Sequence, residues 1–198
     1  MTLHDTVTLA SASVRRSQLL DQICVRHVIR PAEVDETLRV GEAPQAYVRR
    51  LAEAKARAGW AADASRPVLA ADTAVALGAE LFGKPTDLNN CVRMLGALAG
   101  RSHQVLSAVA VRHAAGLATA LSVSVVTLRA LSREECAHYW ASGEPAGKAG
   151  GYAIQGLAAT FITRLSGSYS GVMGLPLAET ARLLAGASVR LWNTEEAA

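Results

Sequence analysis

A carboxylate stands inside an apolar run of the sequence, in the segment VLAADTAVALGAELFGKP at residues 68–85. Asp72 is followed by Thr73, and Lys84 comes a short hairpin later. An ionised carboxylate in a buried strand is costly unless a cation or hydrogen-bond donor compensates it. A desolvated carboxylate with charged partners is also typical of active sites. Asp72 is therefore a candidate catalytic residue, and the rest of the chain must supply its partners.

The second half of this segment nearly matches a phosphate-binding loop. Gly78, Gly83 and Lys84 fit the spacing GxxxxGK, but Pro85 stands where Ser or Thr is required. Proline offers neither an N–H to a phosphate nor a hydroxyl to Mg²⁺, and it biases Lys84 toward an extended backbone. The sequence thus predicts a lysine on an extended segment after a hairpin, within reach of the Asp72 strand. A solvated surface lysine is the alternative.

An anion site is indicated by LASASVRR at residues 9–16, where a strand leads into a helix start. Ser11 can hydrogen-bond to an anion, the helix N-terminus offers N–H groups, and Arg15 and Arg16 supply guanidinium groups for phosphate. A helix cap followed by two solvated arginines is the alternative. Arginine in a first helical turn is mildly unfavourable with the helix dipole, which hints at an anion that offsets it.

Three further places could take part. Lys55 follows Leu51 by four residues, so it lies at the edge of an apolar helical stripe, where a snorkelling lysine is the alternative. Asp35 and Glu36 form an acidic pair in a polar loop, and paired carboxylates suit Mg²⁺. Gln155, in the glycine-rich KAGGYAIQG, carries an amide that could read a base edge. Together these groups suit cleavage of a phosphoanhydride by activated water, with cations stabilising the developing charge.

The elements that must position these residues alternate between strands and helices. The pattern predicts an α/β fold with a mixed sheet and a single domain over residues 1–198. Strands are expected at residues 6–10, 25–29, 67–77, 105–111, 117–128, 161–165 and 189–192. Helices are expected at residues 14–24 behind Ser13, 44–59, 88–99 behind Asp87, from 133 behind a Ser132 capping box, and 176–186.

Composition narrows the class of protein. The chain has 198 residues, 51% of them hydrophobic, and a net charge of +3, which is too mild to indicate a nucleic-acid-binding protein. Cys24, Cys91 and Cys136 show no CxxC, and the histidines show no metal-binding spacing. No apolar run reaches the roughly 18 residues of a membrane span, and no export signal is apparent. We therefore expect a cytoplasmic protein with reduced thiols, acting on a small anionic molecule and not on a membrane.

Six motifs carry a resemblance to a known family. In chain order they are LASASVRRSQLL, EAKARAG, ADTAV, FGKP, GEPAGKAGGYAIQG and GSYSGVMGLPL, and the sequence resembles the Maf family of nucleoside triphosphate pyrophosphatases over nearly its whole length. The resemblance implies a fold related to inosine triphosphate pyrophosphatases, with an elongated mixed sheet flanked by helices and a cleft between two lobes. It also implies hydrolysis of a nucleoside triphosphate to the monophosphate and pyrophosphate, aided by a divalent cation such as Mg²⁺ or Mn²⁺, and the family often forms homodimers.

The motifs also imply roles for individual residues. Asp72 falls on the catalytic proton acceptor and is a candidate metal ligand, and the acidic metal-binding position falls on Asp35 or Glu36. Phosphate-binding or catalytic positions fall on Ser11, Arg15, Lys55 and Lys84, with Arg16 beside them. Positions linked with the choice of base fall on Gln155, Arg15 and Thr73.

The branch that acts on dTTP and UTP typically shows Ala-Asp-Thr and Tyr-x-Ile-Gln-Gly, as this sequence does. The branch acting on 7-methyl-GTP tends to have Ser-Asp-Gln and a Glu at these places. Thymine and uracil present an imide edge, with which a glutamine amide such as that of Gln155 can pair in part. The sequence departs from the family at Val14, where proline is usual, and at Asp35-Glu36, where Glu-Glu is common. A 7-methyl-GTP pyrophosphatase and a non-catalytic regulator that binds nucleotides or nucleic acid are the alternatives.

Overall fold

The computed structural model describes residues 3–192. Strands and helices alternate along the chain, as the hydrophobic pattern predicted. In chain order the elements are β1 (Thr6–Leu9), α1 (Val14–Gln22), β2 (Arg26–Ile29), α2 (Pro44–Ala62), β3 (Val68–Leu77), β4 (Glu80–Phe82), α3 (Leu88–Leu98), β5 (Ser102–His113), β6 (Gly116–Leu128), α4 (Arg133–Ala141), η1 (Ala149–Gly151), η2 (Leu157–Phe161), β7 (Ile162–Ser166), α5 (Tyr169–Met173) and α6 (Leu177–Gly186).

The strands form one seven-stranded sheet in the described part of the chain, in the order β2-β1-β3-β5-β6-β7, with β4 added beside β3. β1 pairs in parallel with both β2 and β3, whereas the other pairings are antiparallel. The predicted mixed α/β sheet is therefore confirmed.

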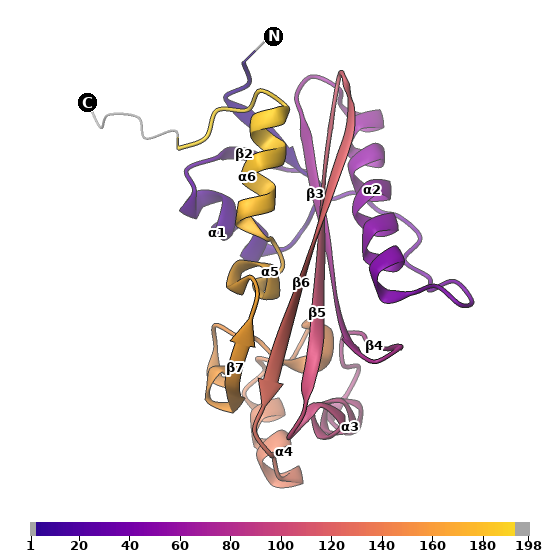
Figure 1. The fold of residues 1–198 in the computed structure, drawn as a ribbon, viewed down its shortest axis with the longest axis vertical. Coiled ribbons are helices and arrows are strands. Elements are labelled where there is room, and N and C mark those ends of the chain that lie inside the picture. The colour runs from indigo at the N-terminus through magenta and orange to yellow at the C-terminus, as the bar shows by residue number, and fades with distance from the viewer. Residues whose placement is uncertain (1–2, 193–198) are drawn as a thin grey trace.

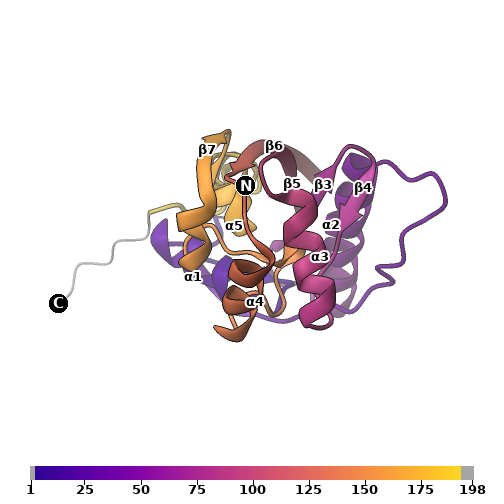
Figure 2. The same ribbon diagram turned by 90° about the horizontal axis from the view of Figure 1, so that it is seen from below.

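Three long strands, β3, β5 and β6, run along the molecule and connect its two ends (Figure 1). One end, the first lobe, holds β1, β2, α1, α2 and α6. The other end, the second lobe, holds β4, β7, α3 and α4, and Figure 2 shows α3 and α4 side by side at this end. No helix of residues 3–192 is long and apolar enough to cross a membrane.

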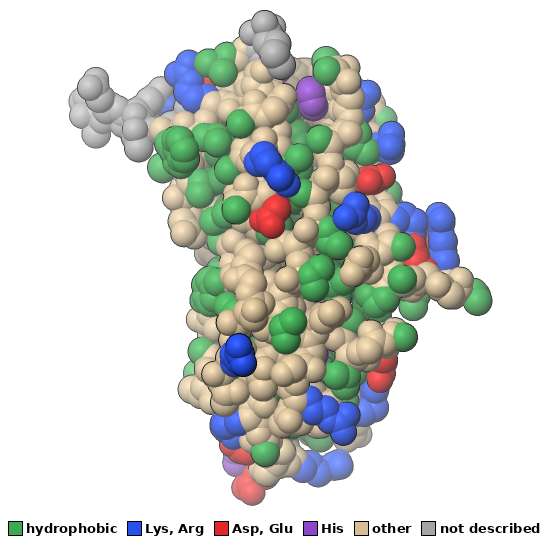
Figure 3. Space-filling view, viewed as in Figure 1, with side chains coloured by type: hydrophobic (Ala, Val, Ile, Leu, Met, Phe, Trp, Pro, Cys, Tyr) green, Lys and Arg blue, Asp and Glu red, His purple; other side chains and the backbone are tan. Residues whose placement is uncertain are grey.

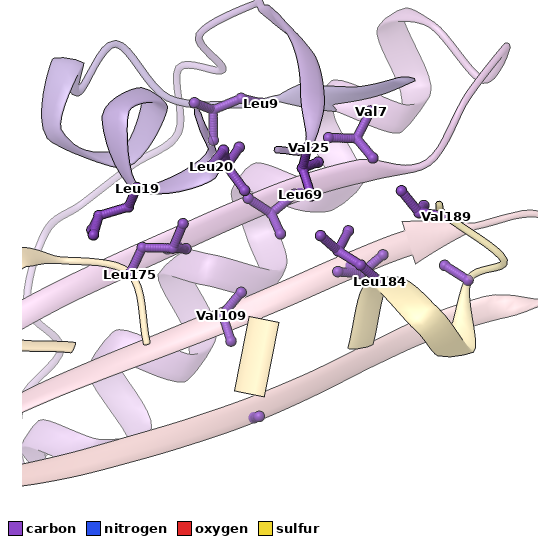
Figure 4. Close-up of a cluster of buried hydrophobic side chains, with 14 residues drawn as sticks. Val7, Leu9, Leu19, Leu20, Val25, Leu69, Val109, Leu175, Leu184 and Val189 are labelled. Carbon is purple, nitrogen blue, oxygen red and sulfur yellow. The ribbon is translucent and has the colours of Figure 1, made fainter. Parts of the chain in front are cut away.

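Packing on the two faces of the first lobe differs in side-chain size. On one face, leucines and valines of β1, α1, β3, β5 and α6 point toward one another, as Figure 4 shows for Leu9, Leu20, Leu69, Val109 and Leu184. On the other face the residues of α2 and of the segments beneath it that pack together are mostly alanines. These are Ala10, Ala52, Ala56, Ala70, Ala74, Ala76, Ala108 and Ala110.

Small residues let the α2 helix lie close to the sheet. A Cβ added at Gly59 would stand 2.8 Å from Val68 Cγ1, so this glycine is needed for close approach. The sequence pattern had placed the end of the helix at Gly59, and this was wrong because α2 continues to Ala62. The close packing holds the middle of α2, which carries Lys55, against β3, which carries Asp72.

Two capping predictions were confirmed and one was wrong. The Asp87 side chain accepts a hydrogen bond from Asn90 N, and Ser132 and Glu135 form a reciprocal capping box. Ser13 stands at the N-cap of α1, but its side chain makes no capping hydrogen bond. The α1 N-terminus therefore keeps its N–H groups free of a side-chain cap.

The predicted last strand at residues 189–192 was also wrong. Only Val189 forms a bridge, a single parallel one with His4. Ser188 and Trp192 have φ angles of 57° and 53°, in the left-handed region that breaks an extended strand. The chain therefore leaves the sheet after one residue of pairing.

Candidate active site

A gap in the sheet lies at the middle of β3. One edge of β3 pairs with β5 from Val68 to Ala76. The other edge pairs with β1 only at Val68 and Leu69, and with β4 only from Val75 to Leu77. No strand of the described chain pairs with residues 70–74 on that edge. Asp72 and Thr73 lie in this gap, at a free edge of an otherwise continuous sheet.

The main chain of Thr73 is turned toward the gap. Along a strand, the N–H and C=O of alternate residues point to the same side. Leu69 O accepts a hydrogen bond from Ala10 N of the β1 side, and Val75 is in register with Phe82 of β4. Thr73 has the same parity as these two residues, so its N–H and C=O face the open edge.

A cavity of about 850 Å³ opens at this gap and receives residues from both lobes. The first lobe contributes residues 10–16, Glu36, Tyr47 and Lys55. The second lobe contributes residues 81–84 of the β4 hairpin and several residues of the 146–155 segment. The cavity has the position of the expected cleft between two lobes and is large enough for a nucleotide-sized ligand.

The compensation for the buried charge of Asp72 comes from Lys55. Lys55 Nζ lies 2.7 Å from Asp72 Oδ1 and 2.5 Å from Glu36 Oε1, so one ammonium group joins two carboxylates. Asp72 is only 8% exposed. Burial raises the pKa of Asp72, and the charges of Lys55 and Arg16 oppose this rise. The lysine at the edge of the apolar stripe is thus turned inward, away from solvent.

The free oxygen of Asp72 defines what the carboxylate can do. Lys55 donates to Asp72 Oδ1, and within residues 3–192 no hydrogen bond engages Asp72 Oδ2. A carboxylate with one oxygen held and the other free can accept a proton from water or bind a cation. The raised pKa makes Asp72 a stronger base than an ordinary aspartate.

Two arginines are aimed into the cavity by main-chain carbonyls from the far end of the sequence. Arg15 Nε donates to Met173 O at 3.3 Å, and Arg16 Nε donates to Gly174 O at 2.9 Å. Arg16 also donates from a terminal nitrogen to Ser11 Oγ at 2.9 Å. Burial lowers the pKa of Arg16, with Asp72 opposing that shift. The C-terminal end of α5 and the residue that follows it therefore fix the direction of both guanidinium groups.

Thr73 belongs to a chain of hydroxyl groups on the opposite face of β3 from Lys55. Its Oγ1 lies 2.8 Å from Ser107 Oγ, and Ser107 Oγ lies 2.6 Å from Gly171 O. Gly174 O is 3.5 Å from Thr73 Oγ1. Side chains of neighbouring strand residues point to opposite faces, so Asp72 and Thr73 meet a common ligand only at the open edge.

Of the remaining residues predicted from the sequence, all but one line the cavity. Lys84 and Gln155 line the cavity from the second lobe, and both are exposed. Glu36 lines it beside Lys55, whereas Asp35 is outside the lining and accepts a hydrogen bond from Thr37 N. The structure thus brings together all the predicted site residues except Asp35, and of the acidic pair only Glu36 reaches the cavity.

The predicted metal site has few protein donors. Among the described residues no group of three or more His, Cys, Asp and Glu could hold a metal ion. Asp72 and Glu36 each use one oxygen to bind the Lys55 ammonium, and the second oxygen of each carboxylate is left as a possible metal ligand. Mg²⁺ is usually held by one or two carboxylates together with substrate phosphates and water. The residues therefore fit a metal ion that binds with its substrate.

Several supporting residues were not anticipated from the sequence. Glu144 accepts hydrogen bonds from the Tyr139 hydroxyl and from the main-chain N–H groups of Leu157 and Ala158, which fixes the 146–155 segment that carries Gln155. An acidic residue opening a glycine-rich segment was the available signal. His103 Nε2 lies 2.7 Å from the hydroxyl of Tyr152, a cavity residue. Burial lowers the pKa of His103 to about 4, so its imidazole is neutral at pH 7.

Comparison with known proteins decides the family. A family model described as Maf-like protein matches residues 6–187, which include every site residue named above. The chain belongs to the Maf family. Within the family, a Methylococcus capsulatus protein named dTTP/UTP pyrophosphatase is 52% identical over 177 residues, 89% of this chain and 88% of its own. The protein of that name from Chromobacterium violaceum is 48% identical over 191 residues, 93% and 96% of the two chains.

One further curated relative and one solved structure are also similar to this chain. A Xylella fastidiosa protein named nucleoside triphosphate pyrophosphatase is 51% identical over 181 residues, 89% of this chain and 96% of its own. Among solved structures, the Staphylococcus aureus Ham1 protein matches 62% of this chain and 71% of its own, with 16% identity and a TM-score of 0.44. On the face seen in Figure 3, the basic side chains of this Maf protein are scattered and form no continuous patch.

Proposed function

We propose that this Maf-family protein hydrolyses nucleoside triphosphates, with dTTP and UTP preferred, to the nucleoside monophosphate and pyrophosphate. The observation that carries the proposal is a buried carboxylate, Asp72, held by Lys55 at the open edge of β3 inside a cation-lined cavity. The names of the similar proteins, dTTP/UTP pyrophosphatase and nucleoside triphosphate pyrophosphatase, support this reaction and substrate class.

In the proposed reaction, Asp72 takes a proton from the water that attacks the α-phosphorus. Its Oδ2 is the oxygen available for this step, because Oδ1 is bound by Lys55. The raised pKa of Asp72 makes it a stronger general base, because its pKa is closer to the operating pH than that of an ordinary aspartate. Lys55 holds the carboxylate in position and keeps it ionised until the proton is transferred.

The remaining cations bind the triphosphate and stabilise the charge that develops on its oxygens. Arg15 and Arg16 approach from the first lobe, and Lys84 from the second. Guanidinium groups suit the bidentate recognition of phosphate, whereas a lysine acts as a point charge. Ser11 orients Arg16 through its hydroxyl. Placing cations on both sides of the cavity lets the pyrophosphate remain bound while its bond to the α-phosphorus breaks.

We propose that Asp72 and Glu36 hold a divalent cation, Mg²⁺ or Mn²⁺. Coordination of the cation by Asp35, which lies outside the cavity lining, stays a prediction. When bound, such an ion would neutralise phosphate charge and lower the pKa of a coordinated water. Gln155 and Thr73 are the proposed base-reading residues. A cytoplasmic location is part of the proposal, supported by the free thiols of Cys24, Cys91 and Cys136. A homodimer that binds no nucleic acid remains a prediction.

A substrate panel with detection of released pyrophosphate tests the proposal. It should include dTTP, UTP, CTP, GTP and 7-methyl-GTP, each with Mg²⁺ and with Mn²⁺. Asp72→Asn should lower kcat for dTTP by about 100-fold or more, since the carboxylate that accepts the proton is lost. Asp21→Asn, at an exposed position of α1, is the matched control and should keep full activity. Full turnover by Asp72→Asn would refute the assigned role, and preference for 7-methyl-GTP would refute the substrate assignment.

A further inference from the structure

A buried serine stands directly behind Thr73. Ser107 on β5 is in register with Thr73 on β3, and it is only 1% exposed. Its hydroxyl touches two groups, Gly171 O at 2.6 Å and Thr73 Oγ1 at 2.8 Å. Both distances are normal for O–H···O hydrogen bonds.

The direction of these hydrogen bonds follows from counting protons. Gly171 O is a carbonyl and can only accept, so Ser107 must donate its single proton to it. Ser107 then has only lone pairs left for Thr73, and Thr73 must donate its own proton to Ser107. The alternative acceptor for Thr73, Gly174 O at 3.5 Å, is beyond the usual O–H···O range. The Thr73 hydroxyl is thereby left as an acceptor.

An acceptor at this place restricts the ligand. Thr73 lines the cavity, and what its hydroxyl can offer there is a lone pair. Phosphate oxygens also offer lone pairs, so the Thr73 hydroxyl does not bind phosphate and needs an N–H or O–H from the substrate. Its main-chain N–H faces the same open edge and supplies a donor. The acceptor distinguishes the pyrimidines where it meets ring position 3: uracil and thymine carry an N–H there that can donate to it, whereas cytosine carries a lone pair. Cytosine could satisfy the same acceptor only by shifting so that its exocyclic amino group takes that place.

We propose that Ser107 is a positioning residue for base selection: it takes the proton of Thr73 and so makes Thr73 an acceptor that favours uracil and thymine over cytosine. The inference rests on the proposed function, because it needs a nucleoside triphosphate in the cavity. Ser107 itself does not touch the substrate. Its effect is carried entirely by the orientation of the Thr73 hydroxyl.

The test compares kcat/KM for UTP and CTP in the unchanged protein and in Ser107→Ala. Without Ser107 Oγ, the Thr73 hydroxyl can turn its proton toward the ring nitrogen of cytosine. The UTP-to-CTP ratio should fall about tenfold, mainly through improved use of CTP. The matched control is Ser122→Ala, which removes a buried serine hydroxyl from the neighbouring β6 position without touching Thr73. Its ratio should equal that of the unchanged protein.

The outcomes separate the two proposals. If the unchanged protein turns over no nucleoside triphosphate, the proposed function fails. If it is active and Ser107→Ala keeps the same UTP-to-CTP ratio, or loses activity equally on both, the inference is overturned. A change in the ratio of UTP to 3′-deoxy-UTP alone would overturn the assignment to the base, since the donor would then be a sugar hydroxyl.

A second variant covers the case in which Ser107→Ala does not fold. Thr73→Val keeps the side-chain shape and removes the acceptor itself. The value of kcat/KM for UTP should fall about tenfold, while that for CTP should not fall. Equal losses on both substrates would overturn the inference.

Discussion

Replacing Lys55 with methionine tests whether this lysine is the compensation for the buried charge of Asp72. Methionine keeps the length and the apolar stem of lysine but removes the ammonium that lies 2.7 Å from Asp72 and 2.5 Å from Glu36. Glu36 is half exposed and can recover hydration. Asp72 is 8% exposed, so its carboxylate is left without its hydrogen-bonded cation in a poorly solvated site.

The expected cost is set by Asp72. Removing one partner of a buried ion pair costs about 3–5 kcal/mol. We expect the low end, about 3 kcal/mol, because Arg16 still lies near enough to favour the ionised form. For a chain of this size that corresponds to a fall in Tm of about 6–12 °C.

The cost should depend on pH in a defined direction. Burial already raises the pKa of Asp72, and losing Lys55 raises it further. Between the unfolded-state pKa and this higher folded-state pKa, the folded protein binds more protons than the unfolded chain. Stability therefore falls as pH rises through that window, and the deficit of Lys55→Met relative to the unchanged protein should be larger at pH 8 than at pH 5.

Urea unfolding at pH 5 and pH 8 measures this deficit, with Lys84→Met as the matched control. Lys84 is exposed, so its replacement should change stability by less than about 0.5 kcal/mol at either pH. Adding Asp72→Asn to Lys55→Met should recover part of the loss, because no uncompensated charge then remains. A deficit that is the same at both pH values and is not relieved by Asp72→Asn would refute the compensation by Lys55.

Three further predictions concern the metal, the glycine-rich segment and the thiols. Chelation with EDTA should lower pyrophosphate release from dTTP by about 100-fold or more, with recovery on adding Mg²⁺ or Mn²⁺; activity that persists in EDTA would exclude the metal. In Gly156→Ala the new Cβ would stand 2.2 Å from Glu144 Oε2, so urea unfolding should show a loss of stability of about 1–3 kcal/mol. Gly186→Ala is the control and should change stability little, because its new Cβ would meet no other segment within 4 Å. Equal effects of the two substitutions would contradict the close contact at Gly156. Burial raises the pKa of Cys91 to about 11, so little reactive thiolate is present at pH 7. Mass spectrometry after iodoacetamide treatment at pH 7 should find Cys91 alkylated far more slowly than the partly exposed Cys24. Equal alkylation rates would show that the Cys91 site opens readily.

The sequence predicted those parts of the molecule that depend on local patterns. Strand and helix positions followed from periodicity, and the caps at Asp87 and Ser132 followed from residue types at fixed spacing. The unusual carboxylate of Asp72 was visible because charge is rare in an apolar run. Its link to Lys55 was anticipated only through the family resemblance, because a separation of 17 positions gives no local signal of contact.

The parts that the sequence did not reveal depend on contacts between distant segments. Ser107 meets Gly171 across 64 residues, and Arg16 meets Gly174 across 158. A serine in a strand and glycines in or just after a short helix are ordinary residues in the sequence. Only the folded chain shows that their hydrogen bonds orient Thr73 and Arg16. The end of α2 was misplaced for a similar reason, since Gly59 serves packing against Val68 and not helix termination.

The gap beside β3 explains how one strand can serve two tasks. Asp72 points toward Lys55 on α2, and Thr73 points to the opposite face, toward the loop after α5. Inside a fully paired sheet, no single ligand could contact both side chains, because the sheet itself would separate them. β1 pairs with β3 only up to Leu69 and β4 only from Val75, so residues 70–74 are left as an edge that a ligand can reach from either face. A nucleotide seated across this edge would place phosphate near Asp72 and its cations while a donor group meets Thr73. Reaction and base selection would then be joined through adjacent residues of one strand, and the early end of β1 pairing would be as necessary for function as the side chains themselves.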